Sequence, residues 1–419
     1  MMIKKTVFFL LIGICFCFAQ SGSSSPFSYA GLGDINFRGT QVTRFMGGID
    51  VFSDSIHANL NNPASYGDLK LTTYSLGVHY KSNLMMSQDN KEYKSIAALD
   101  YLAVGIPAGK FGFGFGLIPY SSIGYRVESI NNNDQGVSVI NNYQGSGGLN
   151  KAFLSIGFPF LKYFTSGITI NYGFGSLLYR TSQFKENVNL GTFLSNSSSL
   201  SGLNYQVSIN AKIPIKKLYS LRFMYSLQPS SDFNSRNERI IFTQDINGTQ
   251  ISDFEQVNLD LIGMSETKLS LSKKIKYGFG FGKSKKWFVG VQQNSINSVI
   301  FGSEFMEKDN IKYSSGTQFS IGGFYLPNFS SLTSYWKRIV YRFGYRSENT
   351  GLIFNSFPLK ETAFSFGLGL PMAGFSNANI GFEFGSRGQN SKSFIQENFF
   401  AFRIGFSLND KWFIKRKFN

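Results

Sequence analysis

The sequence predicts an all-β fold: a transmembrane antiparallel β-barrel of about fourteen strands with an N-terminal hatch in its lumen. Aromatic residues make up 16% of the 419 residues, and Gly occurs 44 times. Apolar and polar residues alternate along many segments, which is typical of strands that present different faces to different surroundings. Beyond the first twenty residues, no uninterrupted apolar run reaches the roughly 18 residues of a spanning helix. The aromatic content also excludes a disordered chain.

The first nineteen residues are predicted to be a cleaved export signal. Lys4 and Lys5 precede an apolar stretch over 6–18, and Ala19 supplies a small residue at the cleavage site. A lipid anchor is disfavoured, because each Cys of this segment follows a bulky residue, Ile14 or Phe16.

Both Cys residues of the chain, Cys15 and Cys17, lie within this signal. The mature chain is therefore not a disulfide scaffold, and extensive backbone pairing or a large core must stabilise it. Removal of the signal takes away two Lys and lowers the formal charge from +16 to +14, so the excess of cations remains.

The alternation is clearest between Phe164 and Leu178. One face carries Phe164, Ile168, Ile170, Tyr172 and Phe174, and the other carries Thr165, Gly167, Thr169, Asn171, Gly173 and Gly175. The same period of two recurs at 111–117, 203–213, 219–227, 269–281, 339–345, 364–370, 380–384 and 400–408.

These strands are predicted to cross a membrane. A soluble sandwich uses strands of about five or six residues, whereas an outer-membrane strand needs roughly 9 to 11 with an apolar lipid face. A sheet in lipid must close into a barrel, since an open edge would leave backbone groups unpaired. From Leu71 onward the chain contains about fourteen or fifteen alternating segments, and because barrels of this kind have even strand numbers we expect about fourteen strands. We expect extracellular loops at 129–148, 183–201, 230–266 and 302–314.

The segment 20–68 lacks sustained alternation and is predicted to be the hatch, with the barrel spanning 69–419. A disordered tail is the alternative. Phe45, Met46 and Phe52 are too apolar for a free tail, and a wide barrel leaves space that must be filled.

Several motifs support a family resemblance, and they cover essentially the whole mature chain: Asn62-Pro63-Ala64, 145–151, 365–371, 381–388, 397–400 and 408–413. With these motifs the chain resembles the FadL-like outer-membrane transport family, in the branch common in Bacteroidota. The resemblance implies a fourteen-stranded barrel with a hatch. It also implies uptake of long-chain fatty acids or other hydrophobic molecules, or else a plugged structural subunit of a larger outer-membrane machine.

Cations are predicted to line the lumen. Strand parity turns the following residues inward: Lys212, Arg222, Lys274, Lys276, Arg342, Arg346, Glu383 and Arg403. The cations among them could attract an anionic headgroup, pair with the hatch acids Asp34, Asp50, Asp54 and Asp68, or at strand ends bind lipid phosphates. The candidate ligand-binding residues are Phe45, Met46, Phe52, Arg222, Arg342 and Arg403.

Asn62, Pro63 and Ala64 are predicted to form the bend from the hatch into the first strand, because Pro fixes φ and lacks an N–H donor. A gating role is the alternative.

Enzyme chemistry is not expected. The only His residues are His57 and His79, and neither lies in a recognisable catalytic or metal-binding pattern, so we predict no catalytic residue, no metal and no cofactor. Nucleic acid is excluded as a partner, since the positive charge is spread along a barrel.

The sequence thus predicts a protein of the outer membrane of a Gram-negative bacterium, in contact with its lipid and lipopolysaccharide. It is expected to be a channel for hydrophobic small molecules; the alternative is an accessory barrel bound to other subunits of an outer-membrane assembly.

Overall fold

The computed structural model describes residues 23–412, except 88–89, 133–135, 217, 246–248, 298–304, 306–309, 374–375 and 392–393. The predicted export signal and both Cys residues lie outside the described residues. Within the described part, no helix is long and apolar enough to cross a bilayer.

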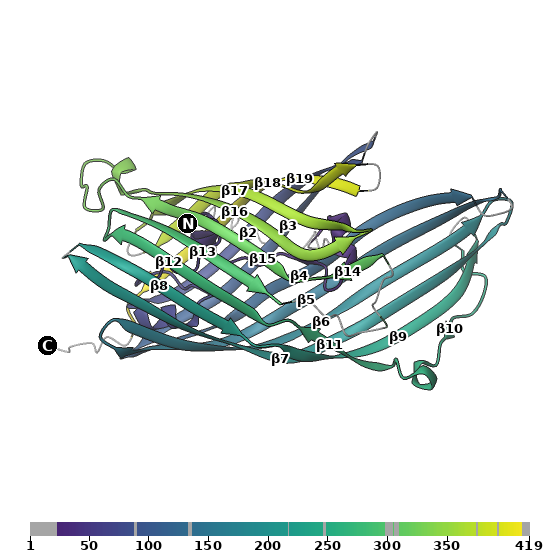
Figure 1. The fold of residues 1–419 in the computed structure, drawn as a ribbon, viewed down its shortest axis with the longest axis horizontal. Helices are drawn as coiled ribbons and strands as arrows, with labels where there is room; N and C mark the ends of the chain where they lie inside the picture. Colours follow the sequence, from purple (N-terminus) through teal and green to yellow (C-terminus); the bar gives the residue numbers. More distant parts are fainter. Residues whose placement is uncertain are drawn as a thin grey trace, which may run out of the picture.

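A closed antiparallel barrel forms the body of the molecule (Figure 1). The last strand pairs with the first wall strand from Gln396↔Met86 to Asp410↔Thr72, which closes the sheet. The wall strands are β2 (Thr72–Ser87), β3 (Asn90–Ala108), β4 (Phe111–Asn132), β5 (Ser138–Leu161), β6 (Phe164–Lys185), β7 (Leu190–Lys216), β8 (Tyr219–Gln228), β9 (Ser231–Asp245), β11 (Glu266–Leu271), β12 (Lys274–Lys283), β13 (Trp287–Ile296), β14 (Ile311–Tyr313), β15 (Gly316–Tyr325), β16 (Val340–Phe354), β17 (Phe357–Pro371), β18 (Asn377–Ser391) and β19 (Phe394–Asp410).

Three of the wall strands are interrupted. β8 and β9 are halves of one strand, as are β11 and β12, and β14 and β15, so the described residues form fourteen strands around the barrel. This confirms the predicted fold class. The short pieces β10 (Glu255–Gln256), η3 (Leu259–Ile262) and η5 (Trp336–Arg338) lie in connections between strands.

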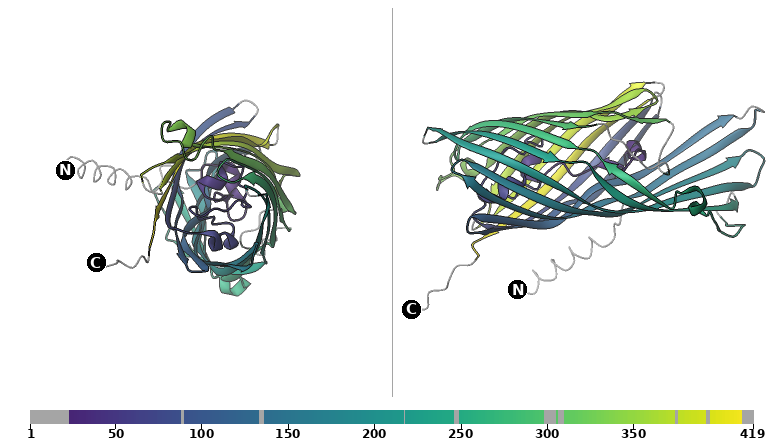
Figure 2. Two further views of the ribbon diagram at one scale, coloured as in Figure 1. Left: turned by 90° about the vertical axis from the view of Figure 1, so that its left-hand side faces the viewer. Right: turned by 60° about the horizontal axis from the view of Figure 1, so that its bottom comes forward.

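The hatch lies inside the lumen, within the ring of strands (Figure 2, left). Its elements are η1 (Pro26–Tyr29), β1 (Asp34–Ile35), α2 (Gln41–Arg44) and η2 (Pro63–Asp68). The two residues of β1 pair with Ser121 and Ser122 of β4, so the hatch shares backbone hydrogen bonds with the wall.

The predicted alternation of faces is confirmed. On β6, Ile170, Tyr172 and Phe174 are exposed on the outside, whereas Thr169 and Asn171 are buried toward the lumen. Aromatic rings therefore face the lipid, as a barrel in a membrane requires.

The prediction of long outer loops is wrong in large part. Strand pairing continues through most of the segments predicted as loops, to Asn132↔Ser138, Val139↔Lys185 and Leu190↔Asp245, and β4, β5, β6, β7 and β9 project beyond the other strands (Figure 1). Polar side chains do not end a strand when water covers both faces of the sheet, because the backbone can still pair.

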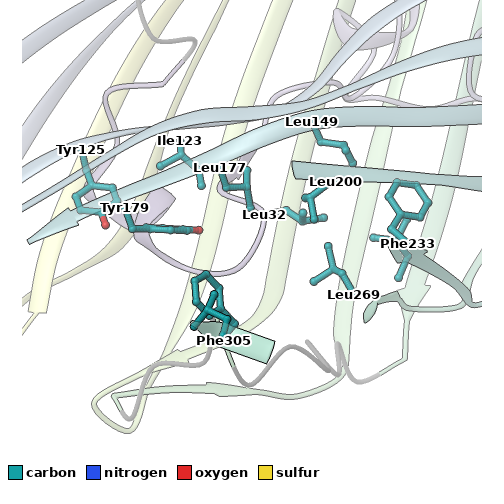
Figure 3. Packing of buried hydrophobic residues seen from close by; sticks show 12 residues of the cluster. Leu32, Ile123, Tyr125, Leu149, Leu177, Tyr179, Leu200, Phe233, Leu269 and Phe305 are labelled. Atoms are coloured by element: carbon teal, nitrogen blue, oxygen red, sulfur yellow. The ribbon is translucent and has the colours of Figure 1, made fainter. Parts of the chain in front are cut away.

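The lumen face is also less polar than predicted near its outer end. Ile123, Leu149, Leu177 and Phe233 turn inward and are fully buried, and Leu32 of the hatch packs against this cluster (Figure 3). On β4 the change of face follows an irregularity between Pro119 and Ser121, which shifts the register.

Candidate functional site

The hatch backbone lies directly on glycines of the wall. A Cβ atom on Gly344 would come within 1.9 Å of the Gly47 nitrogen, and one on Gly112 within 1.8 Å of the Tyr66 carbonyl oxygen. Such approaches are open only to Gly. At this contact Gly47 also has a φ of +72°, which Gly adopts without strain.

A buried cluster of charges joins the hatch to the wall, and we call it the clamp. It contains the cations Arg38, Arg44, Lys81, Arg346, Arg387 and Arg403 and the carboxylates Asp34, Asp100, Glu348, Glu361, Glu383 and Glu397. Its formal charges balance. Buried charges are tolerated when each has partners of opposite sign, so the clamp depends on every member being present.

Glu383 is the central carboxylate of the clamp. Its oxygens lie 2.7 Å from Arg44 Nε, 3.1 Å from Arg403 Nε and 3.0 Å from Arg346 Nη2. Arg44 belongs to the hatch, whereas the other two arginines belong to the wall. Burial and the nearby Arg403 lower the pKa of Arg44 to about 10, so its guanidinium stays charged at neutral pH.

Asp34 is the carboxylate that the hatch contributes to the clamp. It lies 3.0 Å from Arg387 Nη1 and 3.9 Å from Lys81 Nζ. Burial alone would raise the pKa of Asp34, but Arg387 and Lys81 lower it by more, and the net pKa lies below the usual value. The hatch is therefore bound to the wall by ion pairs of both kinds: hatch arginines contact wall carboxylates, and the hatch carboxylate Asp34 contacts wall cations.

The predicted pairing of lumen cations with hatch acids is confirmed for Lys276, whose Nζ lies 2.9 Å from Asp50 Oδ2. Asp34 also pairs with cations of the wall, but these are Arg387 and Lys81, which are not among the predicted lumen cations. The other two acids have partners within the hatch. Asp54 pairs with His57 at 2.7 Å, and Asp68 accepts a hydrogen bond from Ser53 Oγ at 2.6 Å. Most clamp carboxylates belong to the wall, which the sequence did not predict.

The candidate ligand-binding residues separate into two groups. Phe45 and Met46 are fully buried, and Phe52 packs between Phe288 and Phe324 with both ring centroids 5.0 Å away. The three cations hold protein groups: Arg222 stacks on Phe52 and donates to the Ser53 carbonyl, Arg342 donates to Asn379, and Arg403 pairs with Asp100.

The triplet Asn62-Pro63-Ala64 fastens the hatch to the wall. Asn62 precedes η2 and donates to Asn210 Oδ1 at 3.0 Å, and the Ala64 N–H donates to Ser208 Oγ at 2.8 Å. Pro63 begins η2, where its missing N–H is not needed. The bend therefore comes before a 3₁₀ turn, and β2 begins only at Thr72.

A cavity of about 240 Å³ lies in the lumen between the hatch and the wall. Its apolar lining includes Phe27, Leu32, Phe37, Ile118, Leu271, Ile296, Leu352 and Leu359. None of the six candidate ligand-binding residues is among the described residues that line it.

Two lysines bring positive charge to this cavity. Lys151 is 5% exposed, and its Nζ lies 3.4 Å from the centroid of the Tyr120 ring. Lys274 Nζ donates to Tyr120 Oη at 2.6 Å. In the described ranges neither ammonium forms an ion pair, so this end of the cavity can accept an anionic group.

The two histidines serve the structure. His79 bonds Asp100 of the clamp through Nδ1 at 2.8 Å, and His57 bonds Asp54. Within the residues that the structure describes, no three His, Cys, Asp or Glu side chains are grouped so as to hold a metal.

A comparison with protein families matches the family model described as BamG over residues 2–419. The chain belongs to the BamG family. A comparison with curated proteins finds no match for this BamG-family chain.

Solved structures share the fold of the BamG-family chain at low sequence identity. The toluene transporter TodX of Pseudomonas putida has a TM-score of 0.61 and 15% identity, over 90% of this chain and 99% of TodX. The toluene transporter TbuX of Ralstonia pickettii has a TM-score of 0.58 and 11% identity, over 88% and 98%. A FadL homologue of Pseudomonas aeruginosa has a TM-score of 0.56 and 10% identity, over 89% and 99%. The predicted FadL-like barrel is therefore confirmed at the level of the fold.

Proposed function

We propose that the protein is a sealed barrel of the outer membrane that serves as a structural subunit of a larger outer-membrane protein assembly. The clamp is the main support for this proposal, because buried charged residues of the hatch and of the wall pair with one another and hold the hatch inside the lumen. Two voids beside the clamp measure about 10 and about 20 Å³, which is room for little more than a water molecule. The bore is thus tightly packed at the clamp, while the cavity of about 240 Å³ lies elsewhere in the lumen, and a barrel packed in this way suits a scaffold better than a conduit.

The proposal includes the cellular setting. A Gram-negative, Bacteroidota-type cell would export the chain with its signal at 1–19 and insert it into the outer membrane, among lipid and lipopolysaccharide. The strands that project beyond the wall would offer surface to other subunits.

Gentle extraction tests the assembly role. The tagged mature chain, taken from outer membranes in a mild detergent, is expected to elute in a complex heavier than the 46.9 kDa of the unprocessed chain, with subunits in fixed ratio. Size-exclusion chromatography with light scattering and mass spectrometry reads mass and composition. Elution as a lone barrel from freshly lysed cells would exclude the assembly role.

The cavity favours a second candidate function, the uptake of an amphipathic, fatty-acid-like molecule. Lys151 and Lys274 would hold its anionic head, and the apolar lining would hold its chain. Onward passage would then run past Phe45, Met46, Phe52, Arg222, Arg342 and Arg403, and it would require the hatch to move.

Lys151→Met tests this second candidate. We expect dodecanoate to bind about 10- to 100-fold more weakly, since a lost bond to a charged group costs about 1.5–3 kcal/mol. Calorimetry on the purified barrel measures the affinity, with uncharged dodecanol as the matched ligand and Lys162→Met, on an exposed turn, as the matched variant. Equal dodecanoate affinity in the wild type and in Lys151→Met would remove the anion site.

A further inference from the structure

One connection between strands differs from its neighbours at the same end of the barrel. The turns at 109–110, 162–163 and 284–286 are short, and β2 begins and β19 ends at this end. Short turns mark the periplasmic side of such barrels. The connection 326–339, between β15 and β16, is the longest at this end in the described part of the chain, and we call it the foot.

The foot exposes large apolar side chains. Leu332 is 99% exposed, Trp336 is 69% exposed and Phe329 is 56% exposed. Three large apolar side chains exposed within one connection of fourteen residues mark a surface that another apolar phase covers. A surface that covers them is therefore expected.

The foot is held in one shape by hydrogen bonds. The Asn328 N–H donates to the Lys337 carbonyl at 2.7 Å, and the Leu326 N–H donates to the Lys286 carbonyl at 2.6 Å. Tyr335 Oη donates to the Pro371 carbonyl at 3.1 Å. The apolar side chains are thus presented in a fixed arrangement.

The foot folds toward the lipid-facing side of the wall. On β16, Arg342 is buried toward the hatch while Phe343 is exposed, so Tyr341 points outward with Phe343. Tyr341 Oη donates to the Trp336 carbonyl at 3.3 Å, and Figure 2 (left) shows the green foot outside the ring of strands. This position continues a belt of rings on the neighbouring strand ends, where Phe281 lies 5.4 Å from Trp287 and 5.8 Å from Tyr219.

The charge around the foot is entirely positive. Neither 273–297 nor 326–341 contains an acidic residue. Lys337 and Arg338 belong to the foot, and Lys286 Nζ donates to the Pro327 carbonyl at 2.8 Å. Lys285 Nζ lies 4.6 Å from the ring of Phe329. Rings beside Lys and Arg are typical of side chains at the level of lipid headgroups.

From these observations we infer that the foot binds the periplasmic leaflet of the outer membrane. Its apolar side chains enter the boundary between headgroups and acyl chains, and its cations bind anionic phospholipid headgroups. This attachment would fix the barrel's tilt and depth at one side. It does not depend on the proposed function, since a barrel that elutes alone would still insert its foot.

Fluorescence of Trp336 tests the inference. The full-length variant Trp287→Phe/Trp412→Phe keeps Trp336 as its only Trp. It is placed in nanodiscs of phosphatidylcholine with some phosphatidylglycerol, with or without bromine near the headgroup end of the acyl chains. We expect bromine to quench the emission about two-fold or more, because interfacial side chains reach this depth. Equal emission in both kinds of nanodisc would overturn the inference.

Two further variants separate lipid contact from other causes. A barrel lacking the three native Trp and carrying Leu261→Trp, on the exposed η3 of the opposite end, is expected to stay unquenched. Lys285→Glu/Lys337→Glu should retain fewer phosphatidylglycerol molecules by native mass spectrometry while the fold is kept. Unchanged retention, or photo-crosslinks from position 336 only to protein, would also count against the lipid surface.

Discussion

Replacing Glu383 with Gln is expected to loosen the hatch from the barrel wall. The substitution removes the charge that faces Arg44, Arg346 and Arg403, all of them buried. Loss of one member of a buried ion cluster typically costs about 3 to 5 kcal/mol, because the remaining charges lose their compensation. In this protein the destabilisation falls on the contact between the hatch and the wall, because Glu383 lies on the wall and Arg44 on the hatch. We therefore expect a hatch that opens to protease and a barrel that begins to conduct ions.

Trypsin and planar bilayers measure this effect. Arg38 and Arg44 are cleavage sites that the wild-type hatch shields, so Glu383→Gln should be cut there while the wild type resists. Glu266→Gln is the matched control, since Glu266 pairs with Arg236 at 3.5 Å on the exposed surface, where an ion pair contributes at most about 1 kcal/mol. Heat-modifiable mobility on gels shows that each variant still forms a barrel. Equal trypsin resistance of the wild type and Glu383→Gln would show that the clamp does not hold the hatch.

The strand pattern was predictable from sequence because it depends on local physics. Alternation from Phe164 to Leu178 reports a strand with lipid on one side, and the structure places those rings outside. The apolar character of Phe45 and Met46 likewise indicated a packed hatch, and both are fully buried. Both predictions use only the identities of residues that are close together in the sequence.

The clamp was not predictable in the same way. Glu383 and Arg403 lie on the paired strands β18 and β19, but Arg44 comes 339 residues before Glu383, and only the insertion of the hatch into the lumen brings it to them. Strand parity correctly predicts that Arg346, Glu383 and Arg403 point inward. It gives no position along the barrel axis, and so it cannot show that wall carboxylates, and not only hatch acids, lie beside these cations. The inward Leu177 lies on the face that parity assigned to the lumen, yet its burial depends on Leu32, which is distant in sequence.

The cavity was missed for a related reason. In the sequence Lys151 is distinguished only as part of the motif 145–151, because sequence cannot show whether a lysine lies next to an acid. Its distinguishing property is the absence of an ion pair among the described residues, combined with a ring 3.4 Å away. A lysine ammonium without an ion pair can be identified only from the three-dimensional structure, where the neighbouring strands show which side chains surround it.

Gly344→Ala is the second substitution expected to displace the hatch, through shape rather than charge. Its Cβ would lie 1.9 Å from the Gly47 nitrogen and 2.3 Å from the Met46 carbonyl carbon. Both are backbone atoms, so no side chain can turn away. Overpacking usually costs about 1–3 kcal/mol, and a contact between two backbones belongs at the upper end of that range. We expect trypsin to reach the hatch in this variant as well.

Gly290→Ala is the matched control for this steric effect. A Cβ there would meet only side-chain atoms of Phe288 and Ile49, at 3.1 to 3.2 Å, and these can move by a few tenths of an ångström. The two ways of loosening the hatch should differ in their response to salt, because screening acts on charges and not on steric contacts. Added salt should therefore leave trypsin cleavage of Gly344→Ala unchanged. If Gly344→Ala were as resistant to trypsin as Gly290→Ala, the hatch would have room to shift on the wall, and the clamp alone would hold it in place.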